Sequence, residues 1–409
     1  MLLWQRCVLF NFFILPSLPT VTLGYSADVA RNLTKLLFKT NAYDKTLRPA
    51  VDQHSPTVLD VGFHLMGKNK IDELDEKLVT TAYLTLRWKD EFLTWDTSPF
   101  PVGRLTLPQN IVWKPDFVLK NGFTEFKELG GSFYYVIVSR DGSIEWKPYQ
   151  VFESQCSIDV TYFPFDTQTC NIVFTIWSHY LHQVKITSSR SSIKMGEYKS
   201  NSMWDIVSAS QAIDNSGSNS LITFTLKLRR KPAHFVGNIV FPILFLGTLN
   251  ILVFIIPADA GEKMSYSTTV ALGFVVFLTI VSSELPANSE NKPYLSTYLR
   301  IQIIIGGFSL IVSSIQLRLR HRDEDQKVNG FLKILVKFSL CKFWKCQMDK
   351  EGTIIPEDVV DEKNPKNSID DGREISWNDV SSAVDFLMFW VCSFVYLLST
   401  TIVLAMMTA

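Results

Sequence analysis

The sequence lacks an excess of charge of either sign. Its 409 residues contain 40 Lys and Arg against 40 Asp and Glu, so the formal net charge is zero. A nucleic-acid-binding protein would carry a basic excess, and a disordered chain would contain fewer apolar residues than the 47 % found here. Six cysteines are too few for a scaffold held together by disulfides. These absences argue against a nucleic-acid partner and leave a folded protein with sizeable apolar cores.

Charge is missing altogether from four long segments. Asp, Glu, Lys and Arg are absent from residues 235–256, 264–283, 301–317 and 386–409. A helix of about 20 residues spans the roughly 30 Å hydrocarbon layer of a bilayer, and the third segment reaches this length by extending back through residues 294–300. Buried helices of a large soluble protein are the alternative, but they rarely run this far without a charge. The pattern therefore predicts four membrane-spanning helices.

The flanks of these segments predict the topology. Arg6 precedes a short apolar run, 7–15, with prolines and small residues after it, which is typical of a secretory signal peptide over residues 1–24. Basic residues crowd the end of the third segment, from Arg318 to Lys345, as cytoplasmic flanks do. We expect a multi-pass plasma-membrane protein with both ends outside the cell, and a postsynaptic position is one option.

The chain between signal peptide and first span has the texture of a β-domain. Residues 25–231 open with an amphipathic pattern ending at Leu36 and Leu37, which predicts a short helix, and continue with short strands such as the hairpin 135–146. The predicted fold class is mixed, an extracellular β-sandwich with an N-terminal helix fused to a four-helix transmembrane domain. Its further boundaries are 232–320 for three spans, 321–378 for a cytoplasmic loop and 379–409 for the fourth span.

Several side chains suggest modification or surface contacts. Asn32 lies in the only N-x-S/T sequon and is a candidate glycosylation site. Cys341 and Cys346, beside the membrane, are either lipidated or free thiols. The basic half of the cytoplasmic loop suggests a helix on the inner membrane surface, in contact with lipid. The acidic half is either a solvated linker or part of a route for cations leaving a pore.

Cys156 and Cys170 are the only cysteines left outside the cell once the signal peptide is removed, so we expect them to pair. They enclose thirteen residues with Phe163, Pro164, Phe165 and Asp166 at the apex. A simple hairpin staple is one interpretation. An apolar tip on a soluble domain instead indicates that the tip presses on another surface.

The second charge-free segment carries a polar stripe at helical spacing. The stripe consists of Glu262, Ser265, Thr269, Leu272 and Val276, followed by Thr279 or Ile280. Several copies around an axis would form rings of carboxylate, hydroxyl and apolar side chains, which act as a cation filter, a wetted narrow pore and a dewetting gate. The alternative is that these hydroxyls bond only to their own backbone.

These motifs together resemble one family. The thirteen-residue Cys loop with its Phe-Pro-Phe-Asp apex, the run Trp113-Lys114-Pro115-Asp116, Trp204-Asp205, Pro242 in the first span and the linker 256–263 (IPADAGEK) are similar to landmarks of Cys-loop pentameric ligand-gated ion channels, in particular nicotinic acetylcholine receptors. The resemblance implies a homo- or hetero-pentamer of similar subunits that conducts monovalent cations, with calcium permeability left open. It implies no cofactor and no metal. An enzyme is not expected, because the sequence has no H-E-x-x-H, G-x-S-x-G or G-x-x-x-x-G-K motif.

The resemblance also assigns roles to residues. Glu262 falls on the selectivity ring and Leu272 on the central gate. The Cys-loop apex, Glu73 of the acidic run 72–76 and Arg229 of the basic pair before the first span fall on the elements that couple the outer domain to the pore. The alternative for these charges is simple solvation.

The ligand site departs from the nicotinic pattern. Trp177 falls on the family's central cation–π tryptophan and Tyr83 on the aromatic residue of the complementary face, with Glu145 and Lys147 as further candidates. Lys120 stands where a tyrosine is expected, and residues 208–221 contain neither the adjacent cysteines nor any aromatic residue. We therefore expect an unknown small-molecule ligand other than a simple quaternary amine, or a Trp177 that is merely a core residue.

Three functional hypotheses follow. The first is a subunit of a cation-selective ligand-gated channel that acetylcholine does not activate through this subunit's principal face. The second is an accessory subunit of a heteromer that lines the pore without binding agonist. The third is a non-conducting membrane scaffold, which would have no use for the polar stripe.

Overall fold

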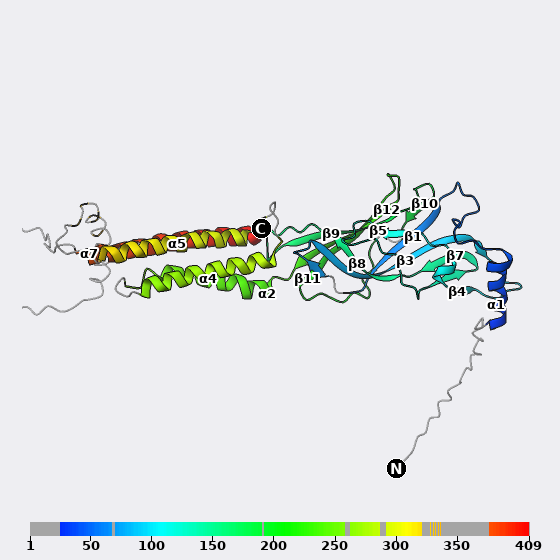
Figure 1. Cartoon of the computed structure of the whole chain (residues 1–409), viewed down its shortest axis with the longest axis horizontal. Helices are drawn as coiled ribbons and strands as arrows, with labels where there is room; N and C mark the ends of the chain where they lie inside the picture. Colours follow the sequence, from blue (N-terminus) through cyan, green and yellow to red (C-terminus); the bar gives the residue numbers. More distant parts are fainter. Residues whose placement is uncertain are drawn as a thin grey trace, which may run out of the picture.

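A computed structural model describes residues 25–67, 70–189, 192–257, 262–286, 292–320 and 376–408, together with 328, 330, 332, 334 and 336. The predicted signal peptide, most of the cytoplasmic loop, and Cys341 and Cys346 lie outside the described residues. The molecule is elongated, with a β-rich part at one end and a bundle of helices at the other (Figure 1).

The β-rich part contains two sheets. The strands of the first are β1 (Thr57–Leu65), β2 (Lys70–Asp72), β3 (Lys77–Thr94), β4 (Arg104–Pro108), β6 (Tyr135–Ser139), β7 (Asp141–Trp146), β8 (Tyr149–Gln155) and β10 (Val184–Thr187). They follow the order β10-β1-β3-β7-β6-β4, and the long β3 also pairs with β2 and β8. The strands of the second are β5 (Phe117–Leu119), β9 (Thr167–Ile176), β11 (Trp204–Asp214) and β12 (Leu221–Arg230), in the order β11-β12-β9-β5. The predicted hairpin at 135–146 is present as β6 and β7.

Aromatic side chains from both sheets form the core between them. Phe63 of the first sheet lies 4.7 Å from Phe224 of the second, measured between ring centroids, and Phe152 lies 5.1 Å from Phe174. Inward residues alternate with outward ones along β12, as the two-residue period of a strand requires. The β-sandwich predicted from the sequence is therefore confirmed.

The predicted N-terminal helix is α1 (Ala27–Lys35), which lies at the end of the β-sandwich farthest from the bundle (Figure 1). Ser26 caps it by accepting a hydrogen bond from the backbone N–H of Val29. Leu33 and Leu37 are buried against the sandwich, whereas Asn32 is exposed. An exposed Asn32 leaves the sequon accessible, and its glycosylation stays a prediction.

Among the described residues, four helices are long and apolar enough to cross a membrane, in agreement with the sequence. The first consists of α2 (Ala233–Phe235), a π-helical turn (Val236–Val240) and α3 (Phe241–Leu252), with Pro242 in the first turn of α3. The others are α4 (Glu262–Glu284), α5 (Tyr294–Arg320) and α7 (Trp377–Thr408). Because proline lacks a backbone N–H, the widened turn directly before Pro242 is a natural place for the ladder of hydrogen bonds to change.

The C-terminal end of α7 lies at the same end of the bundle as the β-sandwich (Figure 1). Four antiparallel spans after an outer domain give this arrangement. The start of the first span and the end of α7 thus lie on the same side of the bundle. We continue to predict that this side is extracellular.

Candidate functional site

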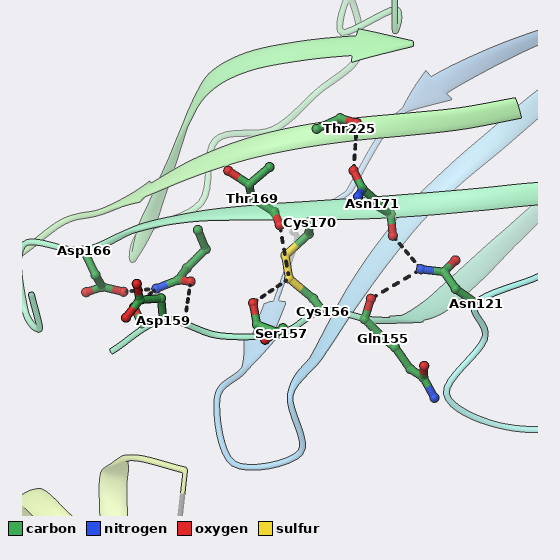
Figure 2. The surroundings of a disulfide bond; sticks show 11 residues. Asn121, Gln155, Cys156, Ser157, Asp159, Asp166, Thr169, Cys170, Asn171 and Thr225 are labelled. Atoms are coloured by element: carbon green, nitrogen blue, oxygen red, sulfur yellow. Dashed lines mark hydrogen bonds between the residues drawn. A yellow bond between two sulfur atoms is a disulfide. The ribbon is translucent and has the colours of Figure 1, made fainter. Parts of the chain in front are cut away.

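The Cys loop is closed by a disulfide. The Sγ atoms of Cys156 and Cys170 are bonded, with 5.1 Å between their Cα atoms, which confirms the predicted pair. Asn121 donates to the backbone oxygens of Gln155 and Asn171 on the two sides of this disulfide (Figure 2). Inside the loop, Gln168 donates to the carboxylate of Asp166 at 2.6 Å. The loop is thus fixed from both sides and has little freedom to move independently of β9.

The apex of the loop presses on the ends of two membrane helices. Phe163 is 1 % exposed and its ring lies 5.0 Å from the ring of Phe235 in α2. The ring of Tyr162 lies 5.7 Å from that of Tyr294, and the backbone N–H of Tyr294 donates to Thr161. Pro164 is buried and Phe165 packs against the core. The sequence predicted that the apolar tip presses on another surface, and the starts of α2 and α5 provide that surface.

A buried cluster of charges joins this apex to the last strand. Arg230, at the end of β12, donates to Asp166 Oδ1 at 2.7 Å and to Glu73 Oε1 at 2.8 Å. The side chains of Arg230 and Asp166 are each 1 % exposed, and that of Glu73 is 19 % exposed. The guanidinium also lies over the rings of Trp204, Phe163 and Phe235, at 4.3–5.3 Å from their centroids. The cluster therefore ties the turn between β2 and β3, the Cys loop and the first span together.

Arg229 is the arginine predicted for coupling, but the contacts described above belong to the next residue, Arg230. Arg229 is exposed and Arg230 makes the contacts, because consecutive residues of a strand point to opposite faces. Of the other carboxylates of the acidic run, Asp72 pairs with Lys70 and Asp75 pairs with Lys77. For these two, the interpretation as surface pairs applies.

The predicted ligand residues fall into two separate groups. Lys120 and Trp177 line a cavity of about 300 Å³ on the second sheet, together with Thr175, Ile176, Leu221 and residues 217–219. Glu145 lines another cavity, of about 480 Å³, on the first sheet with Arg87, Lys89 and Arg104. Within one chain the two groups do not form one site.

Trp177 is not a core residue, because 57 % of it is exposed. It follows β9, and its loop is held by two side chains. The carboxylate of Asp116 accepts hydrogen bonds from the Ser178 backbone N–H and contacts His179 Nδ1 at 3.0 Å. Asn219 donates to the carbonyl oxygens of Ile176 and His179. Burial alone would raise the pKa of Asp116, but the hydrogen bonds from His179 and Ser178 lower the pKa below its usual value, so the carboxylate stays charged near neutral pH.

One aromatic residue of this site was missed from the sequence. The ring of Phe126 lies 4.6 Å from that of Trp177 and is itself half exposed. It lies in the long connection between β5 and β6, which has no periodic pattern. The only available signal was its position ten residues after Asp116, the last residue of the Trp-x-Pro-Asp run.

Lys120 brings a positive charge to the same cavity. Its backbone N–H donates to Val173, its side chain is exposed, and no ion pair to its Nζ is found among the described residues. The pKa of Asp214 lies below its usual value, mainly because Ser216 donates hydrogen bonds to the Asp214 carboxylate. The positive charge of Lys120 lowers the pKa of Asp214 to a smaller extent. The loop between β11 and β12 contributes glycine, serine and asparagine to the cavity and no aromatic ring.

The second group surrounds a carboxylate with cations. Glu145 Oε2 lies 2.6 Å from an Arg87 nitrogen, and its Oε1 lies 2.7 Å from Lys147 Nζ. Burial would raise the pKa of Glu145, but the bonds from Lys147 and Arg87 hold the pKa below its usual value. Tyr83, on the neighbouring strand β3, stacks on His64 with ring centroids 4.2 Å apart. A cation arriving here would meet a carboxylate whose charge is already balanced.

The polar stripe of α4 is the face of this helix that the described parts of the chain leave uncovered. Its members are exposed, Leu272 by 61 % and Val276 by 48 %, and Glu262, Ser265 and Thr269 are exposed as well. The opposite face is buried against the other helices and carries Lys263, Ser267, Val270, Phe274 and Val281. The hydroxyl of Thr269 donates to the backbone oxygen of Ser265 at 2.8 Å. The hydroxyl proton of Thr269 is thus bonded to the helix's own backbone, as the alternative interpretation expected. The hydroxyl oxygen of Thr269 stays exposed and can accept a hydrogen bond.

The chain matches known families along most of its length. The model described as neurotransmitter-gated ion-channel ligand binding domain matches residues 30–232, and that of the neurotransmitter-gated ion-channel transmembrane region matches residues 239–340. Neuronal acetylcholine receptor subunit beta-2 is 30 % identical over 300 residues in Gallus gallus and 31 % identical over 300 residues in Rattus norvegicus, each covering 72 % of this chain. Subunit beta-4 of Gallus gallus is 29 % identical over 301 residues, which is 73 % of this chain.

The matches cover 61 %, 60 % and 64 % of these relatives, so the chain spans about three fifths of their length. The two sheets and the disulfide-closed loop lie in the region that the ligand-binding-domain model matches. The second and third candidate spans, and most of the first, lie in the region that the transmembrane model matches. The chain therefore belongs to the neurotransmitter-gated ion-channel family, the Cys-loop receptors, with nicotinic acetylcholine receptor subunits as relatives, and it is a channel-family protein rather than an enzyme.

Proposed function

We propose that this chain is a subunit of a pentameric, cation-selective channel whose own principal face does not take acetylcholine. The observation that carries the proposal is the uncovered stripe of α4, with Glu262 at one end and Leu272 in the middle. Five copies with this face toward a common axis would enclose rings of carboxylates, hydroxyls and apolar side chains. A scaffold protein would need neither the carboxylate nor the hydroxyls on this face.

The two cavities of the outer domain support a ligand site between subunits. One cavity belongs to the sheet with Trp177 and the other to the sheet with Glu145, and neither is enclosed by its own chain. In a ring of identical subunits the first face of one copy meets the second face of the next. The site would then combine Trp177 and Phe126 with Tyr83, Glu145 and Lys147 of a neighbouring copy.

The charges of this site favour a ligand other than a simple quaternary amine. A cation is attracted by ring faces, and Trp177 with Phe126 offers two. Lys120 at the same cavity repels a cation, and the only carboxylate that lines the other cavity, Glu145, is paired with both Arg87 and Lys147. The accessory role follows from the same observation if the subunit contributes its pore face to a heteromer whose other subunits bind the agonist.

The buried cluster at Arg230 supports a path from ligand to pore. A ligand biases an open or closed pore only if the domains share an element with two states. Arg230, Asp166 and Glu73 join three segments of the outer domain directly above α2, and the Cys-loop apex contacts α2 and α5. Movement of the sheets would therefore be passed to the spans through these contacts.

Expression in oocytes tests the proposal. Leu272→Ser places a hydroxyl in the apolar ring, which should hydrate and leak cations without any agonist. Current from this variant alone supports a homomeric channel, and current only on co-expression with a nicotinic partner subunit supports the accessory role. Surface protein that passes no current in either setting contradicts a conducting role and favours the scaffold.

A further inference from the structure

The carboxylate proposed for the selectivity ring is followed directly by a lysine. Glu262 and Lys263 are adjacent in the first turn of α4, so each subunit brings one negative and one positive charge to the inner end of this helix. If both side chains faced the axis, the ring would have no net charge. A cation filter at this position therefore needs an arrangement that removes the lysine from the axis and balances its charge.

The structure contains such an arrangement. The side chain of Lys263 is 3 % exposed, on the buried face of α4, whereas Glu262 is exposed. Lys263 Nζ donates to Asp385 Oδ1 of α7 at 2.5 Å and to Gln316 Oε1 of α5 at 3.1 Å. Gln316 Nε2 in turn donates to the same Asp385 oxygen at 2.9 Å. Three helices thus enclose one ammonium group.

The positive charge of Lys263 is balanced by the carboxylate of Asp385, a residue far away in the sequence. Asp385 is the only carboxylate within ion-pair distance of Lys263 among the described residues, and 122 residues separate them. A single charge in a low-dielectric bundle acts strongly on its surroundings, whereas a tight ion pair acts as a dipole whose field decays faster. Lys263 without Asp385 would place five uncompensated positive charges around the carboxylate ring.

We propose that Asp385 is a positioning residue for ion selectivity, which holds and neutralises Lys263 so that Glu262 alone sets the charge at the inner mouth. Gln316 completes the site by fixing both members of the pair. This inference rests on the proposed cation pore lined by α4. It gives the last helix, which contributes nothing to the stripe itself, a direct role in which ions pass.

The experiment compares variants in the leaking Leu272→Ser channel. Asp385→Asn should reduce the shift of the reversal potential on NaCl dilution and lower the single-channel sodium conductance by about twofold or more, because the local cation concentration at the ring falls. Asp385→Glu keeps the charge and should retain the parent's selectivity. Lys263→Met removes the positive charge and should retain or strengthen cation preference.

The controls separate electrostatics from structural damage. Asp379→Asn removes the same charge from the first turn of α7, where Asp379 bonds with Ser376 and not with Lys263, and should leave the reversal potential unchanged. If Asp385→Asn does not reach the surface, the double variant Lys263→Met with Asp385→Asn, which buries no lone charge, should reach it with the parent's selectivity. An unchanged Asp385→Asn channel, an equal loss in Lys263→Met, or a double variant with lost selectivity would each overturn the inference.

The parent channel keeps the two claims apart. The cation pore is refuted if the reversal potential of the Leu272→Ser channel shifts with the chloride gradient instead of the sodium gradient. The role of Asp385 is refuted if a cation-selective parent is unaffected by Asp385→Asn.

Discussion

The buried arginine cluster allows the sharpest prediction for stability. Arg230→Gln removes a guanidinium whose side chain is 1 % exposed and leaves Asp166, 1 % exposed, and Glu73, 19 % exposed, without their cation. Removing one partner of a buried ion pair costs about 3–5 kcal/mol. For a domain of this size, each kcal/mol lowers the melting temperature by about 2–4 °C, so the expected loss is roughly 6–20 °C.

The assay is thermal unfolding of the full chain in detergent, followed by the loss of the folded peak in size-exclusion chromatography. Arg229→Gln is the matched control, because Arg229 is the exposed neighbour of Arg230 on the same strand. Its substitution should change stability by no more than about 0.5 kcal/mol. Equal effects of the two substitutions would refute the assignment of the buried contacts to Arg230.

A double-mutant cycle measures the pair itself. Asp166→Asn combined with Arg230→Gln leaves one carboxylate fewer without a partner, so the two losses should fall short of additivity by about 0.5–3 kcal/mol. Strict additivity would mean that Arg230 stabilises the domain through packing on Trp204, Phe163 and Phe235 rather than through its charge.

Further predictions concern the ligand cavity, the Cys loop and the sequon. Lys120→Tyr removes the cation from the cavity of Trp177 and adds a ring, so it should raise the affinity for a quaternary ammonium probe about tenfold or more in a displacement assay; an unchanged affinity would mean that Lys120 does not limit cation binding. Replacing both Cys156 and Cys170 by Ser should cost about 3 kcal/mol and reduce surface expression, which surface biotinylation measures against the intact chain. Asn32→Gln should abolish a mobility shift on enzymatic deglycosylation, and an identical shift in the variant would place the glycan elsewhere.

Much of the fold could be predicted from the sequence, because its signals are local. Absence of charge over long runs identified four spans, and α5 begins at Tyr294, the residue to which the third run was extended. α7 begins at Trp377, before the charge-free run, because its first turns contain the charged residues Asp379 and Asp385. A search for charge-free runs therefore misses the start of this helix. The pairing of Cys156 with Cys170 followed from the compartment alone.

To identify which arginine belongs to the buried cluster, one must know which residues of β12 point inward. Ile222, Phe224, Leu226 and Leu228 are the inward residues of β12, and continuing this alternation selects Arg230 rather than Arg229. The sequence contained this information, and the family landmark drew attention to the basic pair as a whole. Phe126 and the partnership of Lys263 with Asp385 had no such signal, since they depend on tertiary contacts between distant segments.

The central claim is that the uncovered stripe of α4 lines a cation pore, and the reversal potential tests it most directly. In Leu272→Ser channels, tenfold dilution of external NaCl should shift the reversal potential to more negative values, and Glu262→Ala in the same background should reduce that shift. A shift to more positive values, or one that Glu262→Ala leaves unchanged, would contradict the account.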